Sequence, residues 1–309
     1  MRRKVDGLLL LDKPAGITSN AALQAVKRLY RAEKAGHAGT LDPLASGLLP
    51  VLFGEAAKYA GRLLDADKEY LAIARLGATT ATGDAEGEIL ERRPVSASDA
   101  EIARALARFT GRIEQIPPMY SALKRAGRPL YKLARKGVEV ERAPREVQIR
   151  CLELLRRDGD LLELRIVCSK GTYVRTLAED IGAALGTGAY LAGLRRTATA
   201  GFELEDAATF EALERMTSGA RDRRLLAVDR LLEGLPPVLL DAPLAARFRQ
   251  GQSVRLEDGA QPGEKRVYGP GGSFLGLGAL EQAGELRAVR LMASPQASAQ
   301  AAEKHRKNL

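Results

Sequence analysis

The pattern of apolar and polar residues predicts strands at several places in the first half of the chain. Residues 8–11 are four leucines, and the run ends at a turn around Pro14 and Gly16. Residues 68–76 alternate, with Tyr70 and its second neighbours on one side and Leu71 and its second neighbours on the other, as in a strand. Two further apolar segments, 146–155 and 161–168, flank Asp158-Gly159 and are typical of paired strands.

Three segments have the spacing of helices. Ser19 or Asn20 can cap a helix whose apolar residues recur at 23, 26 and 29. Ser98 and Glu101 form a possible capping box before an Ala- and Leu-rich helix to about residue 109. Residues 172–185 predict a third helix, which Gly186 stops.

The last third of the chain has a different pattern. After a boundary at residues 225–237, short strand candidates separated by glycine occupy 238–240, 253–256, 265–268, 273–280 and 286–292. Their density predicts a small β-barrel or a similar all-β module. Residues 293–309 are rich in Ala, Ser, Gln and charge, and we expect a mobile tail there.

Composition narrows the class of protein. A chain of 309 residues allows about two domains. It contains no run of about twenty apolar residues, so no membrane span is expected. The apolar run near the N-terminus is broken at Asp12, which disfavours a signal peptide and favours the cytoplasm. Cys151 and Cys168 form no CxxC motif and are interpreted as buried free thiols.

The supply of metal ligands is poor. His37 and His305 are the two histidines, and neither belongs to a His/Cys cluster. This argues against a zinc deaminase, whose motif needs a histidine and paired cysteines. The chain also lacks a P-loop and a dinucleotide fingerprint. We therefore expect neither a metal nor another cofactor.

The charge favours a polyanionic partner. The net charge is +9, and residues 120–146 hold eight basic and three acidic side chains, a balance of +5. Tyr120 and Tyr131 lie among these basic residues, and basic groups interleaved with aromatic ones suit a nucleic-acid surface. The alternative is a charged face that only water covers.

Candidate chemistry lies in residues 36–47, GHAGTLDPLASG. Its glycines permit positive φ and close backbone approach. Asp42 precedes Pro43, which disfavours the α region and presents the carboxylate from an extended loop. The alternative is a polar turn in which Asp42 caps a backbone group.

Several longer motifs accompany this loop in order: LLLLDKPAGITSN before it, then DKEYLAIARLG, PPMYSALKRAGRPLYKLARKG, CSKGTYVRTLAEDIG and YLAGLRR. In this order and spacing, the chain resembles the bacterial tRNA pseudouridine-55 synthase family, closely over about residues 5–215 and loosely to about 292. The resemblance implies an α+β catalytic domain, residues 1–235, built on a mixed, largely antiparallel sheet. It also implies a basic segment at about 117–146 that grips RNA, and a β-rich, PUA-like RNA-binding domain at 236–292.

The resemblance also implies roles for site residues. Asp42 matches the family's catalytic aspartate, and whether it attacks ribose C1′ or uracil C6 stays open. The other matches would bind the substrate: Tyr70 stacks on the uracil, Tyr173 packs at the base, Arg175 pairs with Asp42, Leu194 completes the pocket, and His37 touches the RNA beside the flipped nucleotide. Tyr173 and Arg175 would point the same way if their segment is extended. Lys13 and Pro14 match a motif that supports the loops, although Lys13 could contact phosphate.

The implied activity is the isomerisation of uridine 55 in the tRNA T loop, by base flipping and rejoining of the base through carbon 5. The expected partner is the tRNA T stem-loop, with no membrane and no obligate protein partner. One alternative is a non-catalytic RNA-binding or RNA-folding protein, which the intact set of site residues disfavours. Another is a synthase guided by a separate RNA, which the absence of long extensions disfavours.

Overall fold

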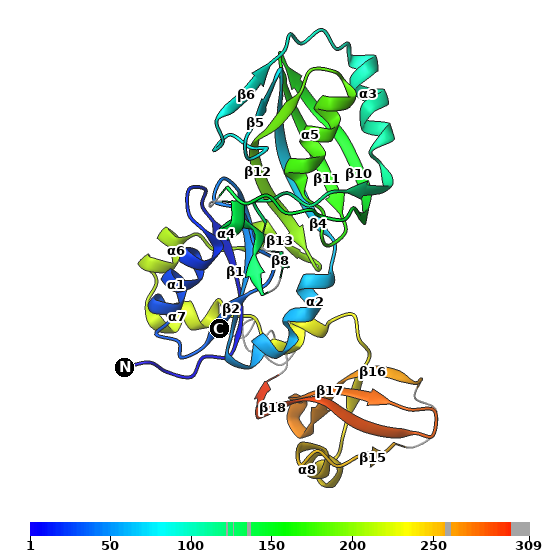
Figure 1. The fold of residues 1–309 in the computed structure, drawn as a ribbon. Helices are drawn as coiled ribbons and strands as arrows, with labels where there is room; N and C mark the ends of the chain where they lie inside the picture. Colours follow the sequence, from blue (N-terminus) through cyan, green and yellow to red (C-terminus); the bar gives the residue numbers. More distant parts are fainter. Residues whose placement is uncertain (122, 126, 135–136, 257–260, 298–309) are drawn as a thin grey trace.

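The computed structural model describes residues 1–121, 123–125, 127–134, 137–256 and 261–297. A nine-stranded sheet runs through the first two thirds of the chain (Figure 1). Its strands are β1 (Gly7–Lys13), β2 (Ala35–His37), β3 (Ser46–Phe53), β4 (Lys68–Leu76), β7 (Gly111–Gln115), β10 (Arg145–Asp158), β11 (Leu161–Cys168), β12 (Ala189–Thr199) and β13 (Phe202–Glu203).

The strand order is β1-β3-β12-β4-β11-β10-β7, with β2 beside β3 and β13 beside β12. All of these neighbours are antiparallel except β3 and β12, which are parallel. Two small hairpins lie outside the sheet, β5 (Ala78–Thr80) with β6 (Ile89–Arg92) and β8 (Lys124–Arg125) with β9 (Arg128–Pro129). The expected α+β class with a mixed, largely antiparallel sheet is confirmed.

The leucine run of β1 is continuous because both of its faces are buried. Leu9 and Leu11 join the main core, together with Val26 of the first helix. Leu8 and Leu10 join a second cluster on the other face, which includes Val228. A strand buried on both sides needs no polar alternation, so the leucine run of β1 is explained by the two clusters that cover it.

Strand β4 shows the predicted alternation. Tyr70 and Ala72 are buried, whereas Leu71 and Ile73 are 40% and 39% exposed on the opposite face. The strand lies between β11 and β12. Tyr70 therefore stands in the middle of the sheet, where the core fixes its ring. The predicted pairing of the two strands around Asp158-Gly159 is also confirmed.

The helices before the C-terminal sheet are α1 (Ser19–Leu29), α2 (Ala60–Asp65), α3 (Asp99–Arg108), α4 (Leu130–Ala134), α5 (Val174–Ala184), α6 (Phe210–Arg215) and α7 (Ser218–Arg223). The cap predicted for α1 is wrong by one residue. The N-cap is Thr18, whose hydroxyl accepts a hydrogen bond from the Ala21 amide at 3.1 Å. Ser19 is already helical and uses its hydroxyl elsewhere, as described below.

The other two predicted helices form. Helix α3 has the expected capping box between Ser98 and Glu101. Helix α5 begins two residues later than predicted, because Tyr173 is its N-cap and has an extended backbone. The idea that one extended segment presents both Tyr173 and Arg175 is therefore wrong, since Arg175 lies in the first helical turn.

The C-terminal part is a five-stranded sheet in the order β14-β16-β17-β18-β15. Its strands are β14 (Pro237–Leu239), β15 (Val254–Arg255), β16 (Gly263–Gly269), β17 (Ser273–Leu280) and β18 (Glu285–Ala297), so all five predicted strands form. Helix α8 (Ala242–Arg249) was not predicted. Strand β18 continues to Ala297, so residues 293–297 do not belong to a tail, and residues 298–309 lie outside the described part.

This sheet packs against the rest of the protein. The Tyr268 hydroxyl donates a hydrogen bond of 2.9 Å to the buried Asp229, next to an aromatic contact between Tyr268 and Phe274. The domain division after residue 235 and the likeness of residues 236–292 to a PUA domain stay predictions.

In the described residues, no helix combines the length and the apolar character that crossing a membrane requires.

Candidate active site

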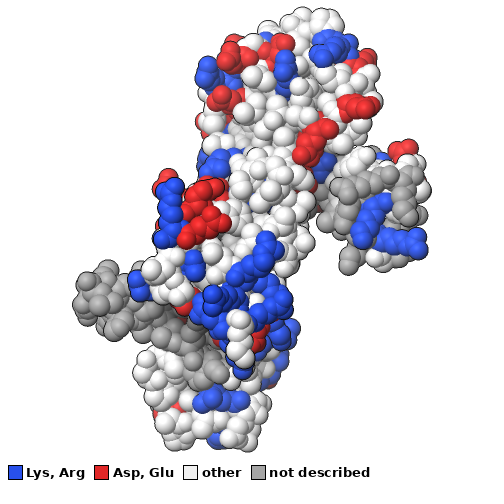
Figure 2. Space-filling view, turned by 90° about the vertical axis from the view of Figure 1, so that its left-hand side faces the viewer, with Lys and Arg blue, Asp and Glu red and all other residues white. Residues whose placement is uncertain are grey.

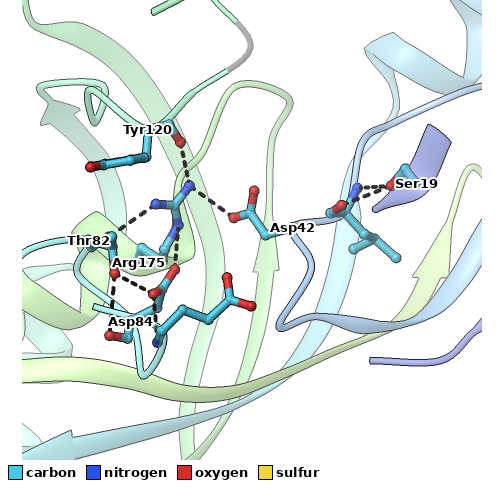
Figure 3. Close-up of polar contacts among 8 residues, drawn as sticks. Ser19, Asp42, Thr82, Asp84, Tyr120 and Arg175 are labelled. Atoms are coloured by element: carbon cyan, nitrogen blue, oxygen red, sulfur yellow. Dashed lines mark hydrogen bonds and ion pairs between the residues drawn. The ribbon is translucent and has the colours of Figure 1, made fainter. Parts of the chain in front are cut away.

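The loop that carries Asp42 connects β2 to β3 and is fixed at its centre by Ser19. The Ser19 hydroxyl accepts a hydrogen bond from the Leu41 amide and donates one to the Leu41 carbonyl, both at 2.8 Å (Figure 3). The Gly16 amide also donates to the Pro43 carbonyl at 2.8 Å. The start of α1 therefore fixes both neighbours of Asp42, which leaves its side chain directed away from α1.

Arg196 of β12 also holds this loop in place. Its side chain is almost completely buried and donates hydrogen bonds to the carbonyls of Leu48 at 2.7 Å and Gly39 at 2.9 Å. Gly47 has φ +101°, and a Cβ atom there would lie 2.3 Å from the Arg196 carbonyl oxygen. The loop can thus approach β12 closely only with glycine at this position. Arg196 is the last residue of the YLAGLRR motif, but nothing in that motif indicates that its side chain fixes this loop.

Arg175 lies at the centre of the site (Figure 3). Its side chain is 5% exposed, and its Nη2 atom lies 3.0 Å from Oδ2 of Asp42. Nη2 also donates to the Tyr120 carbonyl at 2.7 Å, and Nη1 donates to the Thr82 carbonyl at 3.1 Å. The predicted ion pair between Arg175 and Asp42 is therefore present, and the guanidinium also joins two further segments of the chain.

A second carboxylate, Asp84, completes this cluster and was missed from the sequence. Its Oδ2 atom lies 3.6 Å from Nε of Arg175, and its side chain is 5% exposed. The Thr82 hydroxyl and the Glu86 amide both donate to its Oδ1 atom. In the sequence, Asp84 stands in TGDAEG, which indicates a polar turn and nothing more.

The side chain of Asp42 is 40% exposed and opens into a cavity of about 260 Å³. Of the predicted site residues, five line this cavity: Asp42, Tyr70, Tyr173, Arg175 and Leu194. The structure thus brings together residues from the loop after β2, two strands and the start of α5. Ligand pockets usually measure about 300–1,000 Å³, so this one suits a single ring better than a large cofactor.

Two tyrosines border the cavity in different ways. Tyr70 is 8% exposed, and burial raises the pKa of its phenol, which keeps the hydroxyl protonated at neutral pH. Tyr173 is held through its backbone by Gln115, which accepts from the Tyr173 amide at 3.0 Å and donates to its carbonyl at 3.3 Å. Gln115 is 2% exposed and was also missed from the sequence.

The charges around Asp42 oppose one another. Burial raises the pKa of Asp42, the positive charge and hydrogen bond of Arg175 lower it, and the negative charge of Asp84 raises it again. The net direction is upward. Asp42 is therefore an oriented carboxylate that is more basic than an ordinary aspartate. Such a group can act as a nucleophile or base, because both abilities increase with the affinity for a proton.

Lys13, at the end of β1, supports the segment that precedes α1. Its side chain is fully buried, and its ammonium group donates to the carbonyls of Pro14 at 2.8 Å and Ile17 at 2.7 Å. Burial lowers its pKa to about 8, against the favourable charges of Asp42 and Glu86. These contacts favour the interpretation that Lys13 supports the loops, since a buried ammonium group has no access to an RNA phosphate.

His37 lies in β2 opposite Val51 and is not among the residues that line the cavity. Its Nδ1 atom is buried and has no hydrogen-bond partner in the described part of the chain. Burial, and then the positive charge of Arg196, lower the pKa of the imidazole. His37 is thus neutral at pH 7, and its predicted contact with RNA stays a prediction.

The basic segment is described only in part. Arg128, Lys132 and Arg145 are exposed, and Arg142 lies 3.9 Å from Glu139. The structure describes the backbone but not the side chains of Lys124, Arg125 and Tyr131, while Arg135 and Lys136 lie outside the described residues. A grip of this segment on RNA stays a prediction.

Family models match nearly the whole chain. Residues 27–174 match the model of the TruB family pseudouridylate synthase N-terminal domain. Residues 175–235 match the tRNA pseudouridylate synthase B C-terminal domain, and residues 236–292 match the pseudouridine synthase II TruB C-terminal model.

Named relatives agree with these models. The tRNA pseudouridine synthase B of Methylobacillus flagellatus is 53% identical over 292 residues, which cover 94% of this chain and 97% of that protein. The protein of the same name from Cupriavidus metallidurans is 54% identical over 300 residues, 94% of this chain and 95% of that protein. A solved Cbf5-Nop10-Gar1 complex contains a similar chain, with TM-score 0.69, 26% identity, and coverage of 96% of this chain and 86% of that one.

Proposed function

The chain belongs to the TruB family of pseudouridylate synthases, and from that premise we propose that it isomerises uridine 55 in the T loop of tRNA. It is an enzyme, and its activity is the pseudouridylation of tRNA. The choice of position 55, the T loop as the bound element and the cytoplasm as the location are the finer parts of the proposal. They follow from the resemblance of the motifs.

The observation that carries the proposed mechanism is the exposed carboxylate of Asp42 at the edge of the cavity, fixed by the buried Arg175. In the reaction, the bond between ribose C1′ and uracil N1 breaks, and a bond between C1′ and C5 forms. The proton on C5 leaves, and N1 gains one, so the product is an isomer and no oxidant or group donor is needed. Asp42 would attack either C1′ or C6, and the anchored carboxylate suits both.

The cavity lining supports the binding of a flipped base. Tyr70 provides a buried ring, and stacking of a base on an aromatic side chain contributes roughly 1–3 kcal/mol. Leu194 provides an apolar wall. Extruding the base from its stack costs roughly a few kcal/mol, and these contacts would offset part of that cost. His37 would contact the RNA beside this position.

The test is to incubate the purified full-length protein with unmodified tRNA, without added cofactor or guide RNA, and to map pseudouridine. We expect one product at position 55, and none in a transcript that carries cytidine there. Product at another uridine would refute the choice of position. Activity that needs a guide RNA would favour a guided synthase, and tight tRNA binding without product would favour a non-catalytic RNA-binding protein.

Asp42→Asn provides the matched protein control. The amide can still accept a hydrogen bond from Arg175, but it no longer carries the negative charge opposite the guanidinium. We therefore expect the free energy of unfolding to fall by only about 1–3 kcal/mol. Turnover should be lost, because a neutral amide is a poor nucleophile. Binding to tRNA should remain, because phosphate contacts dominate affinity for nucleic acids. A folded Asp42→Asn protein with near-normal turnover would refute the mechanism.

A further inference from the structure

A second basic surface lies at the end of α1 opposite to the end that holds the catalytic loop, and none of its residues lines the cavity. The backbone of Arg3 joins the segment after α1, because its amide donates to the Arg31 carbonyl at 2.8 Å and its carbonyl accepts from the Glu33 amide at 3.0 Å. The N-terminal residues therefore lie next to the end of α1. We define the basic patch by the six cations of these two segments: Arg2, Lys4, Lys27, Arg28, Arg31 and Lys34.

The side chains of the patch lack anionic partners. Five of the six residues are exposed and Lys27 is half-buried, and none of the six forms an ion pair within the described part of the chain. Arg3, which stands among them, is paired with Asp222. Figure 2 views this side of the molecule and shows a dense group of Lys and Arg below its middle. Two acids offset part of this charge, namely the exposed Glu33 and the half-buried Glu55, whose pKa, despite burial, is lowered in part by the charge of Lys34, but the six cations outnumber them.

The helix dipole explains only part of this charge. Lys27 and Arg28 lie in the last turn of α1, where cations are favoured by roughly 0.3–1 kcal/mol. Arg2, Lys4 and Lys34 lie outside the helix. Arg31 lies beyond the C-cap Tyr30 with φ +51°, so it is also outside the helix. A partner with negative charges would compensate the mutual repulsion of these clustered cations.

The patch is within reach of an RNA bound at the cavity. Lys34 directly precedes β2, and Asp42 follows it eight positions further along the chain. Eight residues span at most about 29 Å. One turn of a nucleic-acid duplex spans roughly 34 Å. A tRNA whose uridine lies beside Asp42 therefore extends far enough for other phosphates to meet the patch.

We propose that the basic patch binds phosphates of the tRNA body outside the T arm, so that the enzyme holds the folded tRNA at a second surface. This inference rests on the proposed tRNA substrate. The uridine would bind in the cavity, and the patch would add affinity for the complete tRNA that the isolated T-arm hairpin lacks.

The test compares two RNAs with two triple variants. Lys27→Gln/Arg28→Gln/Arg31→Gln removes three charges from the patch. Arg75→Gln/Arg92→Gln/Arg104→Gln removes three charges from exposed arginines of β4, β6 and α3, outside the patch, and it serves as the matched control. Dissociation constants for full-length tRNA and for the T-arm hairpin are measured over a range of salt concentrations.

For the patch variant, we expect affinity for full-length tRNA to fall by about tenfold or more at 0.15 M salt. The slope of log affinity against log salt should decrease by about 0.7–0.9 for each lost phosphate contact. Affinity for the hairpin and turnover on it should stay at the wild-type level. The control variant should behave as the wild type with both RNAs.

Three results would overturn the inference: unchanged affinity for full-length tRNA, an equal loss with the hairpin, or an equal loss in the control variant. Failure of the proposed function has a different signature. If the wild type forms no pseudouridine in either RNA but still binds full-length tRNA through the patch, the assigned reaction fails while the binding surface stands.

Discussion

Arg175→Lys separates the positive charge of the site from its geometry. Arg175 has two carbonyl partners, at 2.7 Å in Tyr120 and 3.1 Å in Thr82, and two carboxylate partners, at 3.0 Å in Asp42 and 3.6 Å in Asp84. A lysine keeps the charge, but its ammonium group is a single point, whereas the guanidinium is a planar fork. A single nitrogen cannot reach all of the partners that Nη1, Nη2 and Nε of the guanidinium contact along its different edges.

The expected losses follow from these contacts. A hydrogen bond that involves a charged group contributes about 1.5–3 kcal/mol, so losing one of them should lower the free energy of unfolding by about that amount. A domain with a usual stability of about 5–15 kcal/mol would stay folded. Asp42 would lose its fixed orientation, and a displacement of about 1 Å can reduce the rate on the order of a hundredfold.

The assay is single-turnover pseudouridine formation, measured beside tRNA affinity and denaturant unfolding. Arg165→Lys is the matched control, because Arg165 is 41% exposed and pairs with Glu69 at 2.8 Å on the outer face of the sheet. Such exposed pairs contribute about 0–1 kcal/mol, so rate and stability should barely change. If Arg175→Lys is folded, binds tRNA and turns over at the wild-type rate, the fork geometry is irrelevant to catalysis.

Three further predictions concern single features. Asp84→Asn removes a charge that raises the pKa of Asp42, so the acid limb of the pH–rate profile should move to lower pH, and an unmoved limb would exclude this coupling. Tyr70→Phe should keep most turnover because the ring remains, whereas Tyr70→Leu should lose it while tRNA affinity persists; normal turnover in the leucine variant would place Tyr70 outside the uracil site. Arg128→Gln/Lys132→Gln should weaken tRNA binding and flatten its salt dependence by about 0.7–0.9 per lost contact, and an unchanged slope would leave the segment a hydrated surface.

Local sequence patterns predicted β1, β4, β10, β11 and the five C-terminal strands, because burial acts residue by residue, but they did not predict β2, β3, β7, β12 or β13. The alternation around Tyr70 matches its burial in β4, and the five C-terminal strands were separated by glycines that mark their turns. The start of α1 was predicted too late, at Ser19 or Asn20, although Thr18 is also a good cap residue. A tertiary contact decides the choice, since the Ser19 hydroxyl is used by Leu41.

The support of the site could not be predicted in the same way. Each supporting residue is far in sequence from the residue that it contacts. Asp84 is 91 positions from Arg175, Gln115 is 58 positions from Tyr173, and Arg196 is 157 positions from Gly39. Nothing in their immediate neighbours distinguishes them from a turn residue, a strand residue or a surface cation. The family resemblance supplied five residues that line the cavity and the supporting Lys13, but it indicated neither Asp84 nor Gln115 and gave Arg196 no role.

The presence of two carboxylates around one arginine has a physical explanation. A buried arginine beside Asp42 alone would fix the carboxylate but also lower its pKa, and a less basic carboxylate is a weaker nucleophile. Asp84 shares the positive charge of Arg175 and repels the charge of Asp42, which partly reverses this effect. Arg175 therefore determines where Asp42 lies, and Asp84 adjusts how basic it is. The two substitutions should differ accordingly: Arg175→Lys should lower the rate at every pH, whereas Asp84→Asn should also shift the pH at which the rate begins to fall.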